Sequence, residues 1–110
     1  MFILGVIPAR GGSKGLPKKN IRNLGGRPLI SYSIKRASKS KLLSQTIFST
    51  DDQEIASIAK EYDADVPFIR PSHLATDTAS MIDVLKHAVE WAESEGRINN
   101  VDFIVCMQPT

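Results

Sequence analysis

The residues best suited to chemistry lie in one basic, glycine-rich loop near the start of the chain. Residues 8–22 read PARGGSKGLPKKNIR and hold five of the fourteen Lys and Arg residues of the chain. Glycine lets a backbone approach a ligand closely, successive amides can donate hydrogen bonds, and the cations neutralise negative charge. This basic loop follows an apolar run, so the sequence predicts a site for phosphate groups, and a nucleoside triphosphate is the ligand we expect.

Two familiar phosphate-binding motifs are absent from the basic loop. It matches neither G-x-x-x-x-G-K-[ST] nor G-x-G-x-x-G, so the sequence supports neither a P-loop NTPase nor a dinucleotide-binding fold. Taken alone, a loop of this composition is also compatible with a solvated turn.

Charge is distributed unevenly along the chain. Ten of the fourteen basic residues precede residue 51, where there is no Asp or Glu, and all twelve acidic residues follow. This asymmetry predicts an electropositive face for a polyanionic ligand. Nucleic acid is an alternative partner by charge alone. Because only 6% of residues are aromatic and none lies within the basic loop, no stacking platform is evident, and we expect no nucleic-acid partner.

Length and composition suit one domain, or a piece of one, with a real core. No apolar stretch approaches the roughly 20 residues that cross a membrane. Residues 2–7 are too short for a signal-peptide core and have no cationic segment ahead of them, so we expect a cytoplasmic protein without membrane contact. The single cysteine, Cys106, excludes an internal disulfide and lies in an apolar run that predicts a buried strand.

Hydrophobic periodicity predicts alternating strands and helices. Strands are expected at residues 2–7, 45–50, 66–69 and 102–107, the third at an edge because it contains proline. Helices are expected over about 28–40, 51–62 and 77–96, the second opened by the capping-box spacing of Asp51 and Glu54 and the third capped by Asp77 or Thr78. A turn is expected at 23–26. This order predicts an α/β fold with a doubly wound, mainly parallel sheet and Rossmann-like topology, whose ligands bind at the carboxyl ends of the strands.

Several strings together resemble a known family. The sequence IPARGGSKGLPKKN at 7–20 is followed by PLI at 28–30, STDD at 49–52, RP at 70–71 and QPT at 108–110. In this order and spacing they resemble the CMP-N-acetylneuraminate synthetases, or acylneuraminate cytidylyltransferases, over roughly their amino-terminal half. The resemblance implies a nucleotide-diphospho-sugar transferase fold that is incomplete at its C-terminus. Residues 1–110 would be the amino-terminal nucleotide-binding part of a single nucleotidyltransferase domain, ending within the rim of the active site.

The family reaction is implied by the same resemblance. The anomeric hydroxyl of a nine-carbon 2-keto sugar acid attacks the α-phosphorus of CTP, and the CMP-sugar and pyrophosphate form with the help of Mg²⁺. The protein must gather the charge of the triphosphate, align attack with departure and stabilise the leaving pyrophosphate. At full length such an enzyme is expected to be a homodimer.

The resemblance also implies roles for individual residues. Arg10 and Lys19 would be catalytic, contacting the phosphates and stabilising charge that develops in the transition state. The residues expected to bind the nucleotide are Ala9, Arg10, Ser13, Lys19, Asn20, Arg70, Ala79 and Gln108. Within this set, Arg70 would help to define the cytosine pocket, Ala79 would meet the base through its backbone and Gln108 would lie near the nucleotide. Each role has an alternative. Arg10 and Lys19 could be ordinary solvated charges, and Asn20 could be a turn residue. Arg70 could form an ion pair on a helix surface or in a loop, and Gln108 could be a polar residue at a strand end.

Other polar residues carry weaker expectations. Met81 stands where familiar members often have a serine that contacts the base, so only the backbone part of base recognition is expected there. Asp51 and Asp52 could bind Mg²⁺, but helix capping explains them without metal, and the resemblance places the metal ligands beyond residue 110. His73 and His87 are expected to be structural or exposed. Trp91 is expected to pack within a helix face.

Three rival functions stay open on the sequence. The first is CMP transfer to another 2-keto sugar acid such as Kdo, and the second is CTP binding without catalysis. The third is a nucleic-acid-binding role with strong salt dependence. The pair Leu16-Pro17 resembles the sialic and legionaminic acid enzymes more than the pseudaminic acid enzymes. A chain of this extent should also expose surface meant for further strands and a partner subunit, so we expect it to aggregate when produced alone.

Overall fold

The computed structural model describes residues 1–11, 23–76, 79–96 and 98–109. At its centre is a three-stranded parallel sheet in the order β4-β1-β5. These strands are Ile3–Pro8 (β1), Gln45–Ser49 (β4) and Phe103–Cys106 (β5). β1 is therefore paired on both sides, with Leu4 opposite Gln45 in β4 and opposite Ile104 in β5. The predicted parallel α/β arrangement is confirmed.

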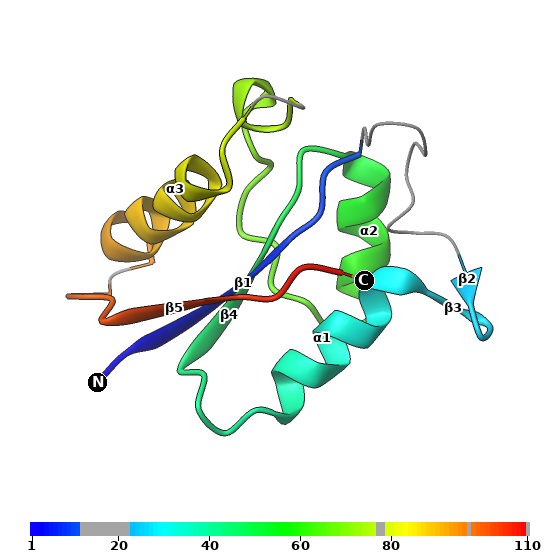
Figure 1. The fold of residues 1–110 in the computed structure, drawn as a ribbon, viewed down its shortest axis with the longest axis horizontal. Coiled ribbons are helices and arrows are strands. Elements are labelled where there is room, and N and C mark those ends of the chain that lie inside the picture. Colours follow the sequence, from blue (N-terminus) through cyan, green and yellow to red (C-terminus); the bar gives the residue numbers. More distant parts are fainter. Residues whose placement is uncertain (12–22, 77–78, 97, 110) are drawn as a thin grey trace.

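Helices cover both faces of this sheet, as a doubly wound fold requires. They are α1 (Leu29–Lys39), α2 (Gln53–Glu61) and α3 (Met81–Ser94). Figure 1 shows α3 and α1 on opposite sides of the strands. Successive side chains of a strand point to opposite faces, so Ile7 of β1 packs in the core under α1 and α2, whereas Leu4 and Val6 pack in the core under α3.

A tight hairpin leads into α1. It joins β2 (Asn23–Leu24) to β3 (Arg27–Pro28) through Gly25 and Gly26, whose φ angles of 64° and 86° are costly for residues with a Cβ. Pro28 then stands at the N-cap of α1. The predicted turn and the start of this helix are both confirmed.

The two other helices begin later than predicted. The N-cap of α2 is Asp52, whose carboxylate accepts a hydrogen bond from the Ile55 amide at 3.0 Å. The prediction of Asp51 as the cap is wrong by one residue. The Asp51 carboxylate instead accepts a hydrogen bond from the Gly11 amide, beyond the end of β1. The N-cap of α3 is Ser80, which accepts from the Asp83 amide at 3.1 Å. Asp77 and Thr78 are therefore not its caps, and they lie outside the described residues.

Residues 66–69 do not form the predicted strand. Their segment meets β4 through separate hydrogen bonds at its two ends, from the Phe48 amide to the Asp65 carbonyl at 2.8 Å and from the Arg70 amide to the Thr50 carbonyl at 2.7 Å. Pro67 has no N–H to donate between them, so a continuous ladder does not form. A short 3₁₀ helix (Ser72–Leu74) follows.

β5 was predicted as a buried strand, but in the structure its side chains are exposed. Phe103, Ile104 and Val105 are 56%, 40% and 42% exposed, and Cys106 is also exposed. The strand itself is confirmed, but burial of Cys106 in the core is wrong. An apolar run indicates burial only where other elements cover it, and no described helix covers β5. Within the described residues, no helix is long and apolar enough to cross a membrane.

Candidate functional site

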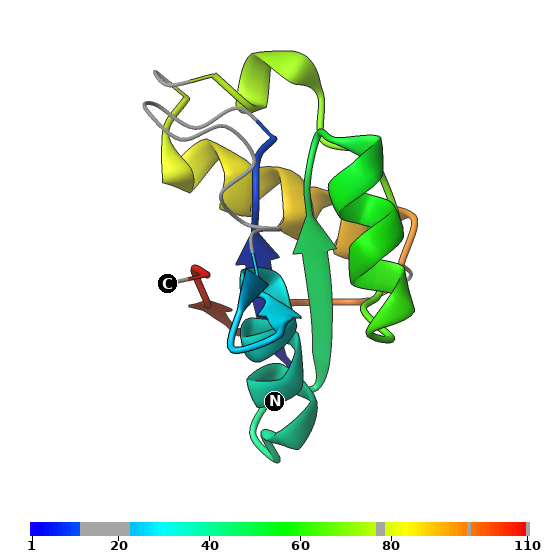
Figure 2. The ribbon, with the colours of Figure 1, turned by 90° about the vertical axis from the view of Figure 1, so that its right-hand side faces the viewer.

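The candidate site is the edge of the sheet where the parallel strands end. Ala9, Arg10 and Gly11 follow β1, the residues from Thr50 to Asp52 follow β4, and Gln108 lies just beyond β5. Figure 2 shows β1 and β4 pointing the same way, so that their carboxyl ends meet at one edge. Ligands of open α/β sheets bind at such an edge. Ser13, Lys19 and Asn20, together with Lys14 and Lys18, lie outside the described residues.

Hydrogen bonds tie the end of β1 to the end of β4. The Ala9 amide donates to the Ser49 carbonyl at 2.9 Å, and the Gly11 amide donates to Asp51 Oδ1, also at 2.9 Å. Ala9 is buried, and its N–H is used within the protein. Its immediate neighbour Arg10 is only partly buried. Of these three residues, the side chain of Arg10 is therefore the group best placed to meet a ligand.

Arg70 lies inside the protein at the same edge, and only 4% of it is exposed. Its guanidinium donates from Nε to Ser49 Oγ at 3.0 Å, from one terminal nitrogen to the Ser49 carbonyl at 2.7 Å and from the other to the Leu74 carbonyl at 3.1 Å. At least three of its five N–H groups thus serve the fold. The surface or loop ion pair considered from the sequence is not what is seen, because Arg70 is a buried brace between β4 and the 3₁₀ helix.

The charges around Arg70 act on its pKa in opposite directions. Burial lowers the pKa of the guanidinium from its ordinary value, Asp51 raises it, and Arg10 lowers it. Arginine stays protonated in proteins despite such shifts. Arg70 therefore lies under the influence of one carboxylate and a second cation at this edge, and the excess of positive charge suits a polyphosphate.

The adjacent carboxylates do not form a metal site with other described residues. Asp52 caps α2 and Asp51 accepts from Gly11. In the described ranges, no three His, Cys, Asp or Glu side chains are grouped so that they could hold a metal ion. The capping interpretation holds for Asp52. Both carboxylates therefore have hydrogen-bond partners within the protein, and these contacts account for them without a metal ion.

Ala79 and Met81 flank the start of α3. The Ala79 amide donates to the Thr76 carbonyl at 3.2 Å, so its N–H is already used. Met81 is the first residue of the helix and is 37% exposed. Gln108 is exposed beyond β5, on the far side of β1 from β4. Ala79 and Met81 thus belong to the start of α3 and Gln108 to the end of β5, whereas Arg10 follows β1.

His87 lies on α3 behind this edge. Its ring meets Phe68 edge-on, with centroids 4.6 Å apart, and its Nδ1 is buried without a hydrogen-bond partner in the described structure. Burial lowers the pKa of His87, Glu90 raises it, and Arg70 and His73 lower it. His73 is exposed, and Trp91 packs against the core under α3, as expected.

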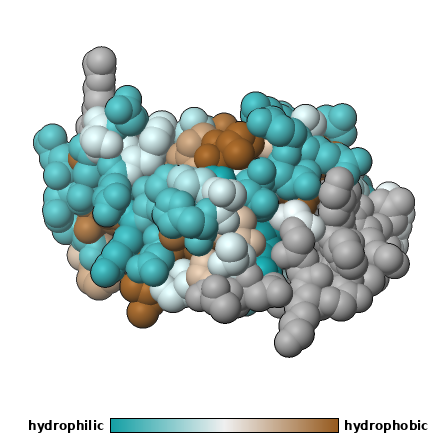
Figure 3. All heavy atoms as spheres, turned by 90° about the horizontal axis from the view of Figure 1, so that it is seen from above, coloured by the Kyte–Doolittle hydropathy of each residue, from teal (hydrophilic) through white to brown (hydrophobic). Residues whose placement is uncertain are grey.

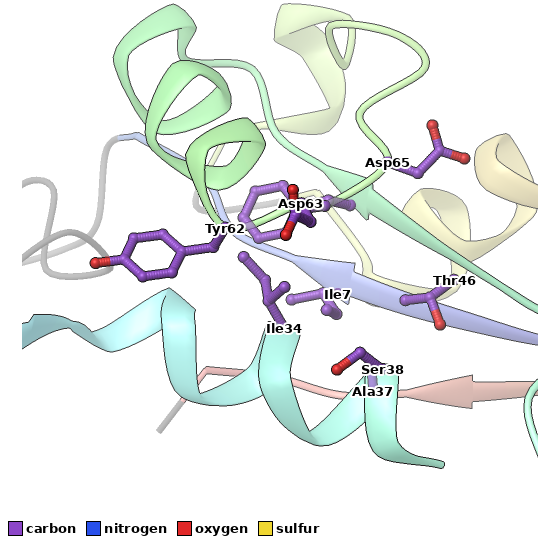
Figure 4. Close-up of a pocket in the computed structure, with 10 residues that line it drawn as sticks. Ile7, Ile34, Ala37, Ser38, Thr46, Tyr62, Asp63 and Asp65 are labelled. Carbon is purple, nitrogen blue, oxygen red and sulfur yellow. The ribbon is translucent and has the colours of Figure 1, made fainter. Parts of the chain in front are cut away.

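Three hollows of the described part of the chain lie away from this edge. One of about 290 Å³ is formed between α1 and the end of α2, where Ile7 and Ile34 lie between Tyr62 and Thr46 (Figure 4). A second, of about 320 Å³, lies between α3 and β5 and is almost wholly apolar. A third, of about 270 Å³, has Arg27 and Lys35 in its lining together with the carboxylates of Glu61 and Asp63. The first hollow has no basic residue in its lining and the second has Lys86. Seen from above, the described surface is mainly hydrophilic with smaller hydrophobic patches (Figure 3).

A doubly wound parallel sheet whose first strand runs into a basic, glycine-rich sequence is an α/β architecture that binds its ligands at the carboxyl ends of the strands. The chain belongs to the cytidylyltransferase family, whose model matches residues 4–108.

Three similar proteins are named as cytidylyltransferases or as a CMP-acid synthase. The chain is 43% identical to a pseudaminic acid cytidylyltransferase of Campylobacter jejuni over 96% of its own length and 44% of the relative's. It is 50% identical to a CMP-N,N'-diacetyllegionaminic acid synthase of Legionella pneumophila over 74% of its length and 35% of the relative's. It is 44% identical to an N-acylneuraminate cytidylyltransferase of Escherichia coli over 79% of its length and 20% of the relative's. The chain thus spans less than half of each.

A solved structure confirms the fold. A CMP:2-keto-3-deoxy-manno-octonic acid synthetase complexed with CTP aligns with a TM-score of 0.78 and 24% identity, covering 99% of this chain and 40% of that one. At this identity the likeness concerns the fold alone.

Sequence reasoning missed what Asp51 and Ser49 do. The pattern drew attention to the carboxylate pair, but as a metal site or a cap. The contacts of Asp51 and Ser49 depend on the pairing of β1 with β4. This pairing places Gly11 beside Asp51 and Ala9 beside Ser49. A polar string directly after a buried strand was the available signal, and it could not show which strand end lay opposite.

Proposed function

We propose that the protein containing this chain transfers CMP from CTP to a nonulosonic acid and releases pyrophosphate. Residues 1–110 would be the nucleotide-binding part of its single nucleotidyltransferase domain. The observation that carries the proposal is the carboxyl edge itself, where Arg10 and Gly11 lead from β1 into the basic loop. It is supported by family membership over residues 4–108 and by relatives named for three nonulosonic acids.

The cations of the basic loop would hold the triphosphate. Arg10 and Lys19 stabilise the charge that develops as the bond from the α-phosphorus to its bridging oxygen breaks, while the anomeric oxygen of the sugar acid attacks from the opposite side. Ser13, Asn20 and the glycine amides complete the phosphate cradle. Pyrophosphate then leaves with the electron pair of the broken bond.

The cytidine would lie across the strand ends. Ala79 contributes its backbone, Gln108 its amide, and Arg70 the N–H groups that its internal hydrogen bonds leave over. Cytosine and uracil differ in the donors and acceptors on their pairing edges, so fixed groups of this kind can discriminate between them.

We infer that the acceptor is a sialic or legionaminic acid, on the strength of Leu16-Pro17. The named relatives include a pseudaminic acid enzyme with the longer match, so all three acids belong in the assay, with Kdo as a fourth. Mg²⁺ dependence, a cytoplasmic location and a homodimer at full length complete the proposal. They follow from the family resemblance, and the metal ligands would lie beyond residue 110.

The test is pyrophosphate release by the full-length protein that carries this chain, with CTP and each of the four acids. Lys19→Ala should lower kcat by about 100-fold or more, because a preorganised charge at the reacting phosphate is lost. Lys41→Ala, which removes an exposed cation at the end of α1, should leave turnover unchanged. CTP binding without turnover of any acid would instead support a binding protein. Equal affinity for CTP and oligonucleotides, with strong salt dependence, would support a nucleic-acid role.

A further inference from the structure

The contact between Asp51 and Gly11 joins two strand ends that lie far apart in the sequence. Asp51 Oδ1 accepts the Gly11 amide at 2.9 Å across a separation of 40 residues. A hydrogen bond to a carboxylate is stronger than one between neutral groups. Gly11 lies in the basic loop three residues after the end of β1 at Pro8, so this bond ties the start of that loop to the end of β4.

Close packing holds Gly11 at the same place. A Cβ added to Gly11 would lie 2.6 Å from Asp52 Oδ2 and 2.8 Å from Asp52 Cβ, far closer than such atoms approach. The backbone of Gly11 therefore rests directly on the Asp51-Asp52 pair. Position 11 takes glycine because of this approach, and the approach is what brings its amide within reach of Asp51.

Asp51 also has the opposite charge to its neighbours at this edge. The Asp51 carboxylate attracts the guanidinium of the buried Arg70 electrostatically, and the like charge of Arg10 repels that guanidinium. Arg70 in turn holds the carbonyl of Ser49, two residues before Asp51, which also accepts from Ala9. One carboxylate thus connects the backbone leading into the basic loop with the buried cation Arg70.

We propose that Asp51 is a positioning residue for nucleotide binding, which fixes the Gly11 end of the basic loop and balances Arg10 and Arg70. It neither binds metal nor touches substrate. The proposal rests on the proposed function, because what Asp51 positions is the loop assigned to the triphosphate. Loss of the anchor should misplace the phosphate-binding groups and leave the site for the sugar acid unaltered.

The experiment compares three variants of the full-length protein. Asp51→Ala removes the acceptor and the charge, whereas Asp51→Asn keeps a carbonyl oxygen that can accept from Gly11. Asp65→Ala is the matched control, since Asp65 is an exposed carboxylate beyond the opposite end of β4 whose contact is with the Gln45 side chain. Initial rates at varied CTP, varied sugar acid and varied Mg²⁺ separate effects on the three reactants. Hydrogen exchange of the peptide that contains Gly11 reports the anchor directly.

We expect Asp51→Ala to lower kcat/KM for CTP by roughly 10- to 100-fold, the scale of a misplaced catalytic group. KM for the sugar acid and the Mg²⁺ concentration at half-maximal rate should not change. Asp51→Asn should recover a large part of the loss, exchange at Gly11 should rise only in Asp51→Ala, and Asp65→Ala should match the wild type.

Three outcomes would overturn the role of Asp51. One is an unchanged kcat/KM for CTP, and a second is an equal loss in both Asp51 variants together with a raised Mg²⁺ requirement, which would indicate a metal ligand. The third is unchanged exchange at Gly11. If the wild-type protein turns over none of the acids, the proposed function fails. Exchange at Gly11 then still decides whether Asp51 anchors this backbone, and the inference for nucleotide binding falls with the function.

Discussion

Replacing Arg70 with methionine tests whether this residue is chiefly a brace of the fold. The change keeps a long side chain but removes the donors to Ser49 Oγ, the Ser49 carbonyl and the Leu74 carbonyl. The Ser49 carbonyl keeps its bond from the Ala9 amide. Of the three acceptors, the Ser49 hydroxyl and the Leu74 carbonyl therefore lose their only described donor, and Ser49 is fully buried.

The expected loss of stability follows from those two acceptors. A buried polar group left without a partner costs about 1–3 kcal/mol. The sum, reduced because the Leu74 carbonyl is only partly buried, is a decrease of about 2–4 kcal/mol in the free energy of unfolding. Urea unfolding of the full-length protein, followed by circular dichroism, measures it. Arg27→Met, at an exposed arginine of β3, is the matched control and should change stability by no more than about 0.5 kcal/mol.

A double-mutant cycle makes the assignment sharper. If the hydroxyl of Ser49 is the group stranded in Arg70→Met, then Ser49→Ala in the same chain should restore about 1 kcal/mol, since removing both partners costs less than removing one. A loss below about 0.5 kcal/mol in Arg70→Met, accompanied by a large loss of CTP affinity, would refute the reasoning. The guanidinium would then serve the nucleotide rather than the protein.

Two further predictions concern pH and the exposed strand. Burial lowers the pKa of His87, Arg70 and His73 lower it further, and Glu90 raises it. Because the unfolded chain then binds the proton more readily than the folded chain, stability should fall as pH drops below about 6.5. His87→Gln should flatten this dependence in urea titrations at pH 7.5 and 5.5, and an unchanged slope would show that another group is responsible. Residues 1–110 produced alone should self-associate through β5, and Ile104→Lys should reduce this in sedimentation velocity, whereas Leu42→Lys at another exposed apolar residue should not. A monodisperse wild-type chain that melts sharply would contradict this.

The sequence was sufficient to predict elements whose signals are local. The unbroken apolar run of β1 predicts a buried strand, the segment of β4 predicts a second strand, and Pro28 marks the start of α1 because its fixed φ suits a helix end. The alternation of these runs with amphipathic helices predicts the parallel sheet. The basic loop and the carboxyl edge follow from the same order.

Other features depended on neighbours that no local pattern reveals. Residues 66–69 have strand-like composition, but Pro67 breaks the ladder against β4. Cys106 has an apolar environment in sequence but lies on a strand that no described helix covers. Asp51 and Asp52 look equivalent, yet one meets Gly11 across the sheet and the other caps its own helix. The register of β1 against β4 makes the difference, and register is set by the whole sheet.

The position of β1 between β4 and β5 has a consequence for the order in which the protein is assembled during synthesis. β1 precedes both of its partners in the chain, and these end at Ser49 and Cys106, almost sixty residues apart. At about 5–20 residues per second, roughly 3–12 s separate the emergence of the two partners. For that interval one edge of β1 offers unpaired backbone groups. The contact between the Phe2 amide and Asp102 closes that edge across nearly the whole described chain. On the ribosome the central strand therefore appears before both of its partners and is paired on both sides only after the second has emerged.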